Sequence, residues 1–460
     1  MNNINVKKSV LITSVISSFL TAFLGSSVTV ALPAIQRHFK IDAVTLAWIT
    51  SSYLLATATF LLPFGRLSDI IGRKKTFLIG LILFTFFSFL CSFSPNIYTL
   101  IVLRVFQGLG SAMIFSSSTA IISSVFLTGE RGKAMGLSVS AVYLGLTAGP
   151  LLGGILTHNF GWQSIFLLNF PIGVFLGIFV SKNLKNKEWA DSKGEKFDWG
   201  GSFLYIIYLS TFMIGLTKIQ NLQGSVYLAI SIVFIAFFLF VESKVSHPIL
   251  PFKLFTKNTT FTFSNIAALI NYSATFAVSF LLSLYLQYIK GLTPQTTGAV
   301  LAIQPIIQAI FSSLAGKLSD KFEPRYVASF GMILTSLGLF LLSFINFNTT
   351  IGFVVIAQTC LGLGFAFFSS PNTNAIMSSV ESKYYGIASA IVGTMRLVGQ
   401  TLSIGVVTMF FAIYLGGTKF GAHLYPQFLE LSKSLLLGFS IVCGIGVVAS
   451  IARGKIWKEL

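Results

Sequence analysis

Two arginines lie inside long apolar stretches of the sequence, where a charged side chain is unfavourable unless it has partners. Arg104 belongs to "LRVFQGLGSA" (103–112), and Arg396 begins "RLVGQTLSIGV" (396–406). A cation in the membrane interior costs at least about 2.5 kcal/mol on insertion scales, and more if it is isolated. We therefore expect Arg104 to face a polar cavity, with backbone carbonyls or Gln107 accepting hydrogen bonds from it. Arg396 lies a few residues deeper in its span than a simple interfacial anchor would, and both arginines are candidates for a functional role.

The stretch "GRLSDIIGRKK" (65–75) concentrates charge between two apolar runs, and "GKLSD" (316–320) repeats its beginning. Its glycines suit a short hairpin, where the backbone turns or another helix approaches closely. Asp69 can pair with Arg73 four residues later, or lie against the N-terminus of a helix in the other half of the chain. Such a contact, formed in one conformation and broken in another, is a gating latch. We predict that the latch comprises Gly65, Asp69, Gly72, Arg73 and Asp320.

Uncharged hydrogen-bonding side chains recur inside or beside the apolar stretches and are candidates for lining a substrate cavity. They are Tyr53, Gln107, Asn271, Gln304, Gln308, Gln358, Asn372, Asn374 and Gln400. Interhelical hydrogen bonding, worth about 1 kcal/mol or less per contact, explains any one of them equally well. The four histidines and three cysteines show no ligand spacing, so the sequence predicts neither a metal site nor a cofactor.

Membrane-spanning helices must position these residues. The chain of 460 residues is 54% hydrophobic and only 10% charged, whereas a water-soluble domain carries about 25% charged residues. Fourteen apolar stretches are long enough to cross a bilayer as helices. They lack the alternation of a membrane β-barrel, and helices are the remaining way to satisfy backbone polar groups in lipid. The fold class is therefore an all-α polytopic membrane protein.

The net charge of +18 reflects membrane topology and does not indicate nucleic-acid binding. With the N-terminus placed inside, most lysines and arginines fall on the inner side. The outer side receives only Arg37, Lys40, Lys218, Lys290, Lys419 and Lys433. Because an excess of basic residues marks the cytoplasmic side, we expect a multi-pass protein of the plasma (cytoplasmic or inner) membrane with both termini in the cytoplasm.

The chain also repeats itself. "RVFQGLGSA" (104–112) aligns with "QTCLGLGFA" (358–366), so that Gln358 corresponds to Arg104. Repeats of this length in a membrane protein indicate duplicated bundles that can rock around a central cavity. We predict a six-helix bundle at 1–182, a cytoplasmic linker with two inserted helices at 183–260, and a second six-helix bundle at 261–460.

The motifs together resemble the major facilitator superfamily, and within it the fourteen-span drug:proton antiporters. The hairpin is similar to the superfamily signature, with Gly65, Leu67, Asp69, Gly72, Arg73 and Lys74 in the expected places. The stretch around Arg104 resembles the fourth-span motif, whose arginine is implicated in proton coupling. The stretches 162–173 and 396–406 resemble segments of the fourteen-span group, and we take Arg104 and Arg396 as coupling candidates.

"GLTAGPLLGG" (145–154) resembles the antiporter motif of the fifth span. Glycines remove side-chain bulk and a proline removes a backbone hydrogen bond, so the helix can pack against its partner from the other bundle and bend there. The motif comprises Gly145, Gly149, Pro150, Gly153 and Gly154. We predict a hinge or tight seal here, centred on Gly149 and Pro150, whereas general helix crowding is an alternative explanation for Gly153 and Gly154.

One position departs from the family pattern, because Leu24 stands where the fourteen-span group usually carries an aspartate in the first span. No Asp or Glu falls convincingly inside a span. An embedded carboxylate is the ordinary proton carrier, since burial raises its pKa toward neutrality, and it is also the ordinary anchor for a cationic drug. Export of neutral, lipophilic or anionic compounds therefore fits this sequence better than export of permanent cations.

We expect a monomeric secondary active transporter that exports lipophilic drugs or toxic compounds by alternating access, in exchange for protons. The chain has no phosphate-binding G-x-x-x-x-G-K-[ST] loop, which argues against ATP as the energy source. Export or import of a neutral or anionic metabolite, without proton coupling, is the alternative. An integral-membrane enzyme would need His, Cys or paired acids clustered at one membrane face, and the histidines are scattered.

Overall fold

The apolar stretches form long helices. The computed structural model describes residues 3–454 apart from 127, 186, 191, 246–254, 257, 382–384 and 417–420. The first helices are α1 (Asn3–Phe39), α2 (Ala43–Ile71), α3 (Arg73–Cys91), α4 (Ile97–Val125), α5 (Thr128–Phe160), α6 (Gln163–Asn183), α7 (Trp199–Thr217) and α8 (Leu222–Glu242). They are followed by α10 (Thr259–Leu284), α11 (Pro294–Leu301), α12 (Ile303–Lys321), α13 (Pro324–Leu342), α14 (Ile351–Ser378), α15 (Tyr385–Tyr414) and α16 (Tyr425–Ala452).

Fourteen segments of the described chain are helical, long and apolar enough to cross a membrane, which confirms the predicted count. Within the tenth span the helix breaks at Ala302, between α11 and α12, although the sequence predicts one span over 295–315. The cause is Pro305, which has no N–H to donate to the carbonyl of Leu301 and whose ring clashes with that carbonyl in a continuous helix. The chain restarts as α12 just before the proline.

Glycines at corresponding positions of the two halves make corresponding helix contacts. A Cβ atom at Gly110 of α4 would lie 2.7 Å from the carbonyl oxygen of Gly80 on α3, and one at Gly364 of α14 would lie 2.9 Å from that of Gly331 on α13. Small residues let helix backbones approach closely in membranes, where packing replaces the hydrophobic effect. We call α1–α6 the first bundle and α10–α16 the second bundle.

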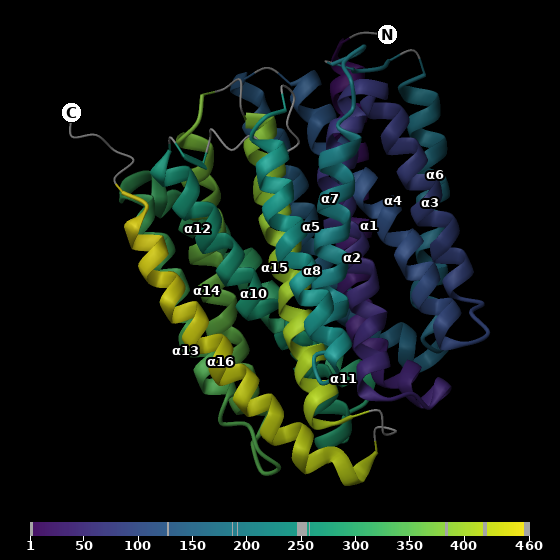
Figure 1. The fold of residues 1–460 in the computed structure, drawn as a ribbon, viewed down its shortest axis with the longest axis vertical. Helices are drawn as coiled ribbons and strands as arrows, with labels where there is room; N and C mark the ends of the chain where they lie inside the picture. Colours follow the sequence, from purple (N-terminus) through teal and green to yellow (C-terminus); the bar gives the residue numbers. More distant parts are fainter. Residues whose placement is uncertain are drawn as a thin grey trace.

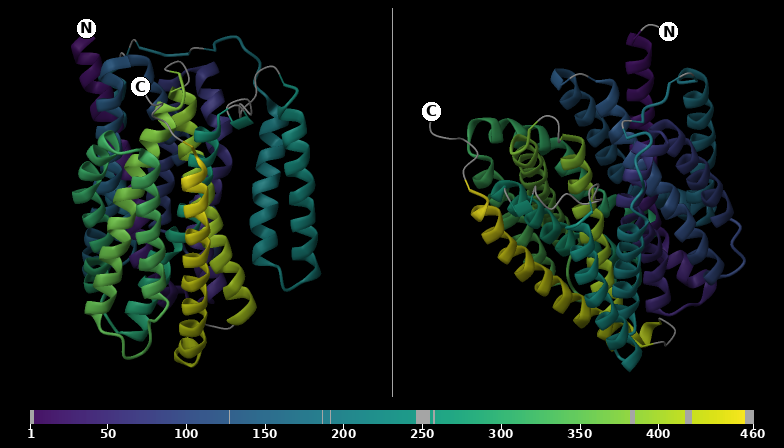
Figure 2. Two further views of the ribbon diagram at one scale, coloured as in Figure 1. Left: turned by 90° about the vertical axis from the view of Figure 1, so that its left-hand side faces the viewer. Right: turned by 45° about the horizontal axis from the view of Figure 1, so that its top comes forward.

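The two bundles lean together at one end of the molecule and diverge toward the end that carries both chain termini (Figure 1). We call the end with the termini the terminal side and the opposite end the far side. The pair α7–α8 stands at the edge of the molecule, and the chain that leads from α6 to α7 crosses the terminal side (Figure 2). Helix α7 packs against both α2 of the first bundle and α15 of the second.

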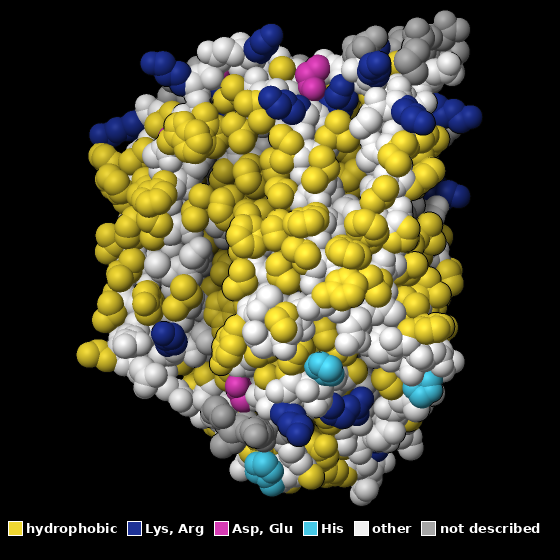
Figure 3. Space-filling model, turned by 90° about the vertical axis from the view of Figure 1, so that its right-hand side faces the viewer, with side chains coloured by type: hydrophobic (Ala, Val, Ile, Leu, Met, Phe, Trp, Pro, Cys, Tyr) yellow, Lys and Arg dark blue, Asp and Glu magenta, His cyan; other side chains and the backbone are white. Residues whose placement is uncertain are grey.

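The surface is divided into bands. On the face shown in Figure 3, a broad apolar band crosses the helices, and Lys and Arg side chains gather at its terminal edge, with a smaller group at the far edge beside histidines. Apolar side chains of the band are well exposed, such as Ile232 at 67% and Val448 at 68%. Exposure of this kind fits contact with lipid, since soluble proteins rarely leave such large apolar patches in water.

Candidate functional site

The two bundles are joined by hydrogen bonds near the far side. The Ser283 hydroxyl of α10 donates to the carbonyl of Thr29 on α1 at 2.8 Å, and Gln287 Nε2 donates to the carbonyl of Val30 at 2.9 Å. Thr29 lies four residues before Pro33, which has no N–H to offer it. Ser283 thus supplies, from the other bundle, the donor that the helix itself lacks.

The glycines of the fifth span do not all face the direction that the sequence analysis expected. A Cβ atom at Gly145 would lie 2.6 Å from the carbonyl oxygen of Phe19, and one at Gly153 would lie 2.6 Å from Cβ of Ser27. A Cβ atom at Gly149 would also meet α1, 2.9 Å from the carbonyl oxygen of Phe23. These three glycines therefore bring α5 against α1 inside the first bundle, because residues four apart share one helix face.

The neighbouring face of α5 contacts the other bundle. A Cβ atom at Gly154 would lie 2.6 Å from the carbonyl oxygen of Pro294 at the start of α11, and one at Gly298 would overlap the carbonyl oxygen of Pro150. No side chain fits between the two backbones at these points. The α5–α11 contact has the form of a tight seal at the far side, whereas α5 continues as one helix through Pro150.

A polar cluster connects the bundles near the middle of their helices. The hydroxyls of Tyr143 on α5 and Ser369 on α14 lie 2.7 Å apart and share a hydrogen bond. Gln308 of α12 interacts with the same Tyr143 hydroxyl, and Tyr272 of α10 lies close to it.

The cluster also contains one cation. Arg396 of α15 lies near Tyr143, and its guanidinium carbon is 5.6 Å from the centre of the Phe115 ring on α4. The Tyr272 ring lies 6.2 Å from that of Phe365. We define the central cluster as Phe115, Tyr143, Tyr272, Gln308, Ser369 and Arg396. It offers ring faces, hydroxyl and amide groups and one positive charge, which suits an aromatic ligand rich in hydrogen-bond acceptors.

Arg104 lies within the first bundle and is only 1% exposed, so it faces no open cavity in this conformation. Its Nε donates to the carbonyl of Ile49 at 3.1 Å and its Nη1 to Gln107 Oε1 at 2.5 Å. Its guanidinium carbon lies 4.2 Å from the centre of the Tyr53 ring. Gln107 Nε2 in turn donates to the Ser88 hydroxyl at 2.7 Å. The expected carbonyl and Gln107 partners are present, and Tyr53 and Gln107 hold Arg104 inside the bundle.

At the α2–α3 hairpin, Arg73 links three helices. Its Nε donates to Asp69 Oδ1 at 2.7 Å, and its Nη1 donates to the Ser124 hydroxyl and to the carbonyl of Ala120 on α4. Gly72 turns the chain with a φ of 117°, a region that favours glycine. The i,i+4 pairing of Asp69 with Arg73 is thus the alternative that the structure contains.

The other two predicted latch residues are Gly65 and Asp320. A Cβ atom at Gly65 would meet only Cβ of Ser116, at 3.7 Å, so packing does not require a glycine there. Asp320 falls in α12, and its side chain lies outside the part of the molecule that the structure describes.

The remaining cavity candidates are scattered. Asn271 Nδ2 lies 4.0 Å from Cys443 Sγ inside the second bundle, and Asn374 Nδ2 donates to the Ser319 hydroxyl at 3.2 Å. Gln358 is fully buried, and neither atom of its amide has a hydrogen-bond partner among the described residues.

Two further candidates lie next to the central cluster. Gln304 and Gln400 are half-buried and stand one helical turn from Gln308 and Arg396 respectively. Of the nine cavity candidates, the structure thus brings Gln308 into the cluster and places Gln304 and Gln400 beside it.

A fully buried arginine at the end of α16 was not singled out by the sequence analysis. Arg453 Nη1 donates to Asn372 Oδ1 at 2.9 Å, and its Nε donates to the carbonyl of Ser450 at 2.7 Å. Burial lowers the pKa of Arg453 to about 10, which still leaves it charged at neutral pH. A basic residue just beyond an apolar span ordinarily extends its charged group to the membrane–water interface. The position and the residue type of Arg453 therefore did not indicate that it would be buried. Asn372 is therefore engaged in supporting this cation.

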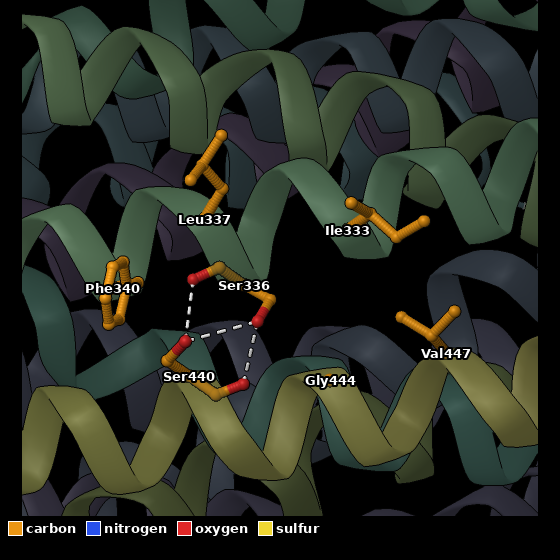
Figure 4. A pocket seen from close by; sticks show the side chains of 7 residues that line it. All are labelled: Ile333, Ser336, Leu337, Phe340, Ser440, Gly444 and Val447. Carbon is orange, nitrogen blue, oxygen red and sulfur yellow. Dashed lines mark hydrogen bonds between the residues drawn. The ribbon is translucent and has the colours of Figure 1, made fainter.

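A groove on the outside of the second bundle is separate from the central cluster. It has a volume of about 490 Å³ and lies between α13 and α16, lined by Ile333, Ser336, Leu337, Phe340, Ser440, Gly444 and Val447. The Ser336 hydroxyl donates to the carbonyl of Ser440 at 2.9 Å, and the Ser440 hydroxyl donates to that of Ser336 at 2.8 Å (Figure 4). Its hydroxyls are engaged in joining the two helices, and its apolar rim belongs to the lipid-facing band.

Known proteins share this sequence pattern over most of its length. Residues 14–404 and 264–453 match the Major Facilitator Superfamily. The riboflavin transporter RibZ of Clostridioides difficile (strain 630) is 31% identical over 444 residues, which cover 96% of each chain. The multidrug resistance protein Stp of Mycobacterium tuberculosis (strain CDC 1551 / Oshkosh) is 31% identical over 400 residues, covering 85% of this chain and 73% of Stp.

The fold has a solved counterpart. A bacterial homologue of the human lysosomal transporter Spinster, in an inward-facing and unoccupied conformation, superposes with a TM-score of 0.65 at 15% identity, covering 97% of each chain. A similarity at this identity establishes the fold alone. The sequence matches and the fold agree with each other and with the motifs, and this chain belongs to the Major Facilitator Superfamily.

Proposed function

We propose that the terminal side is cytoplasmic and that the structure represents the inward-open state of the transporter. The concentration of Lys and Arg at the terminal edge supports this orientation. The bonds between Ser283 and Thr29 and between Gln287 and Val30 hold the far side together, while the bundles diverge on the terminal side. Rocking of the bundles would break these bonds and close the latch hairpin toward the second bundle.

We propose that the protein is a secondary transporter that exports lipophilic aromatic compounds of neutral or negative charge. The central cluster carries this proposal, because both bundles contribute to it and a solute bound there would contact both. Its charged member is Arg396, and the described spans place no carboxylate beside it. Sequence relatives named as multidrug resistance proteins, and the motif of the fifth span, support drug-type efflux of the fourteen-span kind.

Exchange of the solute for protons is the proposed energy source. Arg104 and Arg396 are the coupling candidates. The bonds of Arg104 cross from α4 to α2 and would respond to movement between these helices. A membrane potential of about 150 mV contributes about 3.5 kcal/mol per charge moved, enough for a gradient of several hundredfold.

Transport of a metabolite is the second candidate. The relative named as a riboflavin transporter matches this chain along nearly its whole length, whereas Stp extends beyond the match. Riboflavin is uncharged and has a planar aromatic ring system with many hydrogen-bond acceptors, and such a molecule suits the rings and donors of the central cluster. On this account drug-like aromatics and a flavin would compete for one site.

A vesicle assay tests the substrate class. Everted vesicles containing the protein should accumulate neutral and anionic aromatic compounds, riboflavin among them, more strongly than permanent cations, and an imposed pH gradient should drive the uptake. Arg396→Gln should reduce uptake of the anions by about tenfold, the effect of losing one charge-assisted contact, and that of the neutral compounds much less. A strong preference for permanent cations would contradict the proposed site, and uptake that ignores the pH gradient would contradict proton exchange.

A further inference from the structure

The chain between α6 and α7 is bound to the latch hairpin. We call the described residues 184–185, 187–190 and 192–198 the strap. Glu188 Oε1 accepts a hydrogen bond from the backbone N–H of Lys74, in the first turn of α3, at 2.8 Å. Helix α3 has no side-chain cap of its own, because Gly72 precedes it. A carboxylate satisfies the free N–H groups at a helix start and interacts favourably with the helix dipole. The strap therefore provides the missing cap.

Further bonds run along the strap. The N–H of Arg73 donates to the carbonyl of Trp189 at 2.8 Å, and the N–H of Ser192 donates to the carbonyl of Asp69 at 3.1 Å. Arg66 donates to the Ser192 hydroxyl at 3.1 Å and forms an ion pair with Glu195. Both latch residues of the Asp69–Arg73 pair are thus held through their backbone by the strap.

The strap leads directly into the helix that touches both bundles. Asp198 caps α7 by accepting from the N–H of Gly201 at 2.8 Å. In the terminal half of α7, the Tyr205 hydroxyl donates to the carbonyl of Ala58 on α2 at 3.4 Å. In the far half of α7, a Cβ atom at Gly405 of α15 would lie 2.8 Å from Met213 Sδ. Helix α7 therefore packs against the first bundle in its terminal half and against the second bundle in its far half.

We propose that the strap and α7 together stabilise the conformation seen here, with Glu188 and Glu195 as positioning residues for the latch. When the bundles separate on the far side, α7 must leave either α2 or α15. The strap ties its terminal end to the hairpin of the first bundle, so the contact with α15 breaks. Loosening the strap frees α7 to follow α15 and favours the alternate state. This inference rests on the proposed alternating access.

The test is a distance measurement by double electron–electron resonance on spin-labelled protein in lipid nanodiscs. Labels at Lys75→Cys and Lys321→Cys report the separation of the bundles on the terminal side, because both positions are exposed. The natural cysteines Cys91, Cys360 and Cys443 are replaced with alanine beforehand. The otherwise unchanged chain should sample two distances, whose balance shifts when a transported compound is added.

The double variant Glu188→Gln with Glu195→Gln should shift the balance about threefold toward the shorter distance, an effect typical of losing partly exposed charged contacts. Glu430→Gln, which removes an exposed carboxylate paired with Lys433, is the matched control and should leave the balance unchanged. The variant Arg66→Glu with Glu195→Arg exchanges the charges of one ion pair. Its ratio of the two distances should be closer to that of the unchanged chain than the ratio of Glu195→Gln alone.

The outcomes separate the strap from the proposed function. If the labelled chain shows two distances and the double variant keeps the same balance, the proposed role of the strap is overturned. If the labelled chain holds one distance with and without a transported compound, alternating access itself is overturned, and the role of the strap with it.

Discussion

Replacing Arg104 with alanine is expected to reduce transport by at least about a hundredfold while the protein still inserts and folds. The guanidinium donates to the carbonyl of Ile49 on α2 and to Gln107 on its own helix, and it stacks on the Tyr53 ring. Hydrogen bonds from charged groups contribute about 1.5–3 kcal/mol each, and a tenfold change in rate corresponds to about 1.4 kcal/mol. Initial rates in everted vesicles, with the best substrate of the panel, measure the effect.

Two companion variants define what is lost. Arg104→Lys keeps the charge but cannot reproduce the forked geometry of the guanidinium, so it should recover only part of the rate. Arg37→Ala removes an exposed arginine from the end of α1 and should transport at nearly the original rate. An Arg104→Ala protein that transports normally would show that the buried cation is only structural and takes no part in coupling.

Replacing Asp69 with asparagine is expected to reduce transport by at least about tenfold. Arg73 is 8% exposed, and its Nε donates to the Asp69 carboxylate at 2.7 Å. Removing one partner of a buried ion pair costs about 3 kcal/mol or more, and partial exposure reduces this figure here. The hairpin would then fit less well against α4 and against the second bundle when the terminal side closes.

The control for this variant is a neighbouring charge. Lys75→Gln removes an exposed cation from the same hairpin and should leave the transport rate close to that of the original protein. Equal losses in the two variants would assign the effect to the net charge of the hairpin, and full activity of Asp69→Asn would remove the proposed latch.

The sequence predicts those features that depend on neighbours along the chain. The length of the apolar stretches gives the number of spans, because lipid thickness fixes helix length. The pairing of Asp69 with Arg73 and of Arg104 with Gln107 follows from helical spacing, since residues three or four apart lie on one face. The break before Pro305 also follows from the sequence, because a proline inside a helix removes a hydrogen bond to the preceding turn.

Features that depend on packing between helices could not be predicted in the same way. The central cluster draws side chains from α4, α5, α10, α12, α14 and α15, and only their arrangement in space brings Tyr143 to Ser369. Tyr143 stands two residues before the glycines of the fifth span, and this proximity was the one available signal. Which neighbouring helix each of those glycines contacts also depends on packing, because α5 touches α1 on one face and α11 on the adjacent face.

The strap illustrates a third situation. The sequence predicts only a cytoplasmic linker in this region, and charged segments between spans are usually solvated. The structure gives Glu188 and Glu195 specific partners on the hairpin, which a single sequence cannot distinguish from general solubility.

The central claim is that the bundles must separate on the far side during each transport cycle. A disulfide made by Thr29→Cys with Ser283→Cys, in a chain whose natural cysteines are replaced with alanine, would join α1 to α10 at the place where Ser283 now bonds to Thr29. A matched disulfide within the first bundle, Ser14→Cys with Ser138→Cys, joins side chains whose hydroxyls lie 2.7 Å apart. We expect the first disulfide to abolish vesicle transport until it is reduced and the second to leave transport intact. Undiminished transport by the fully cross-linked Thr29–Ser283 protein would contradict it.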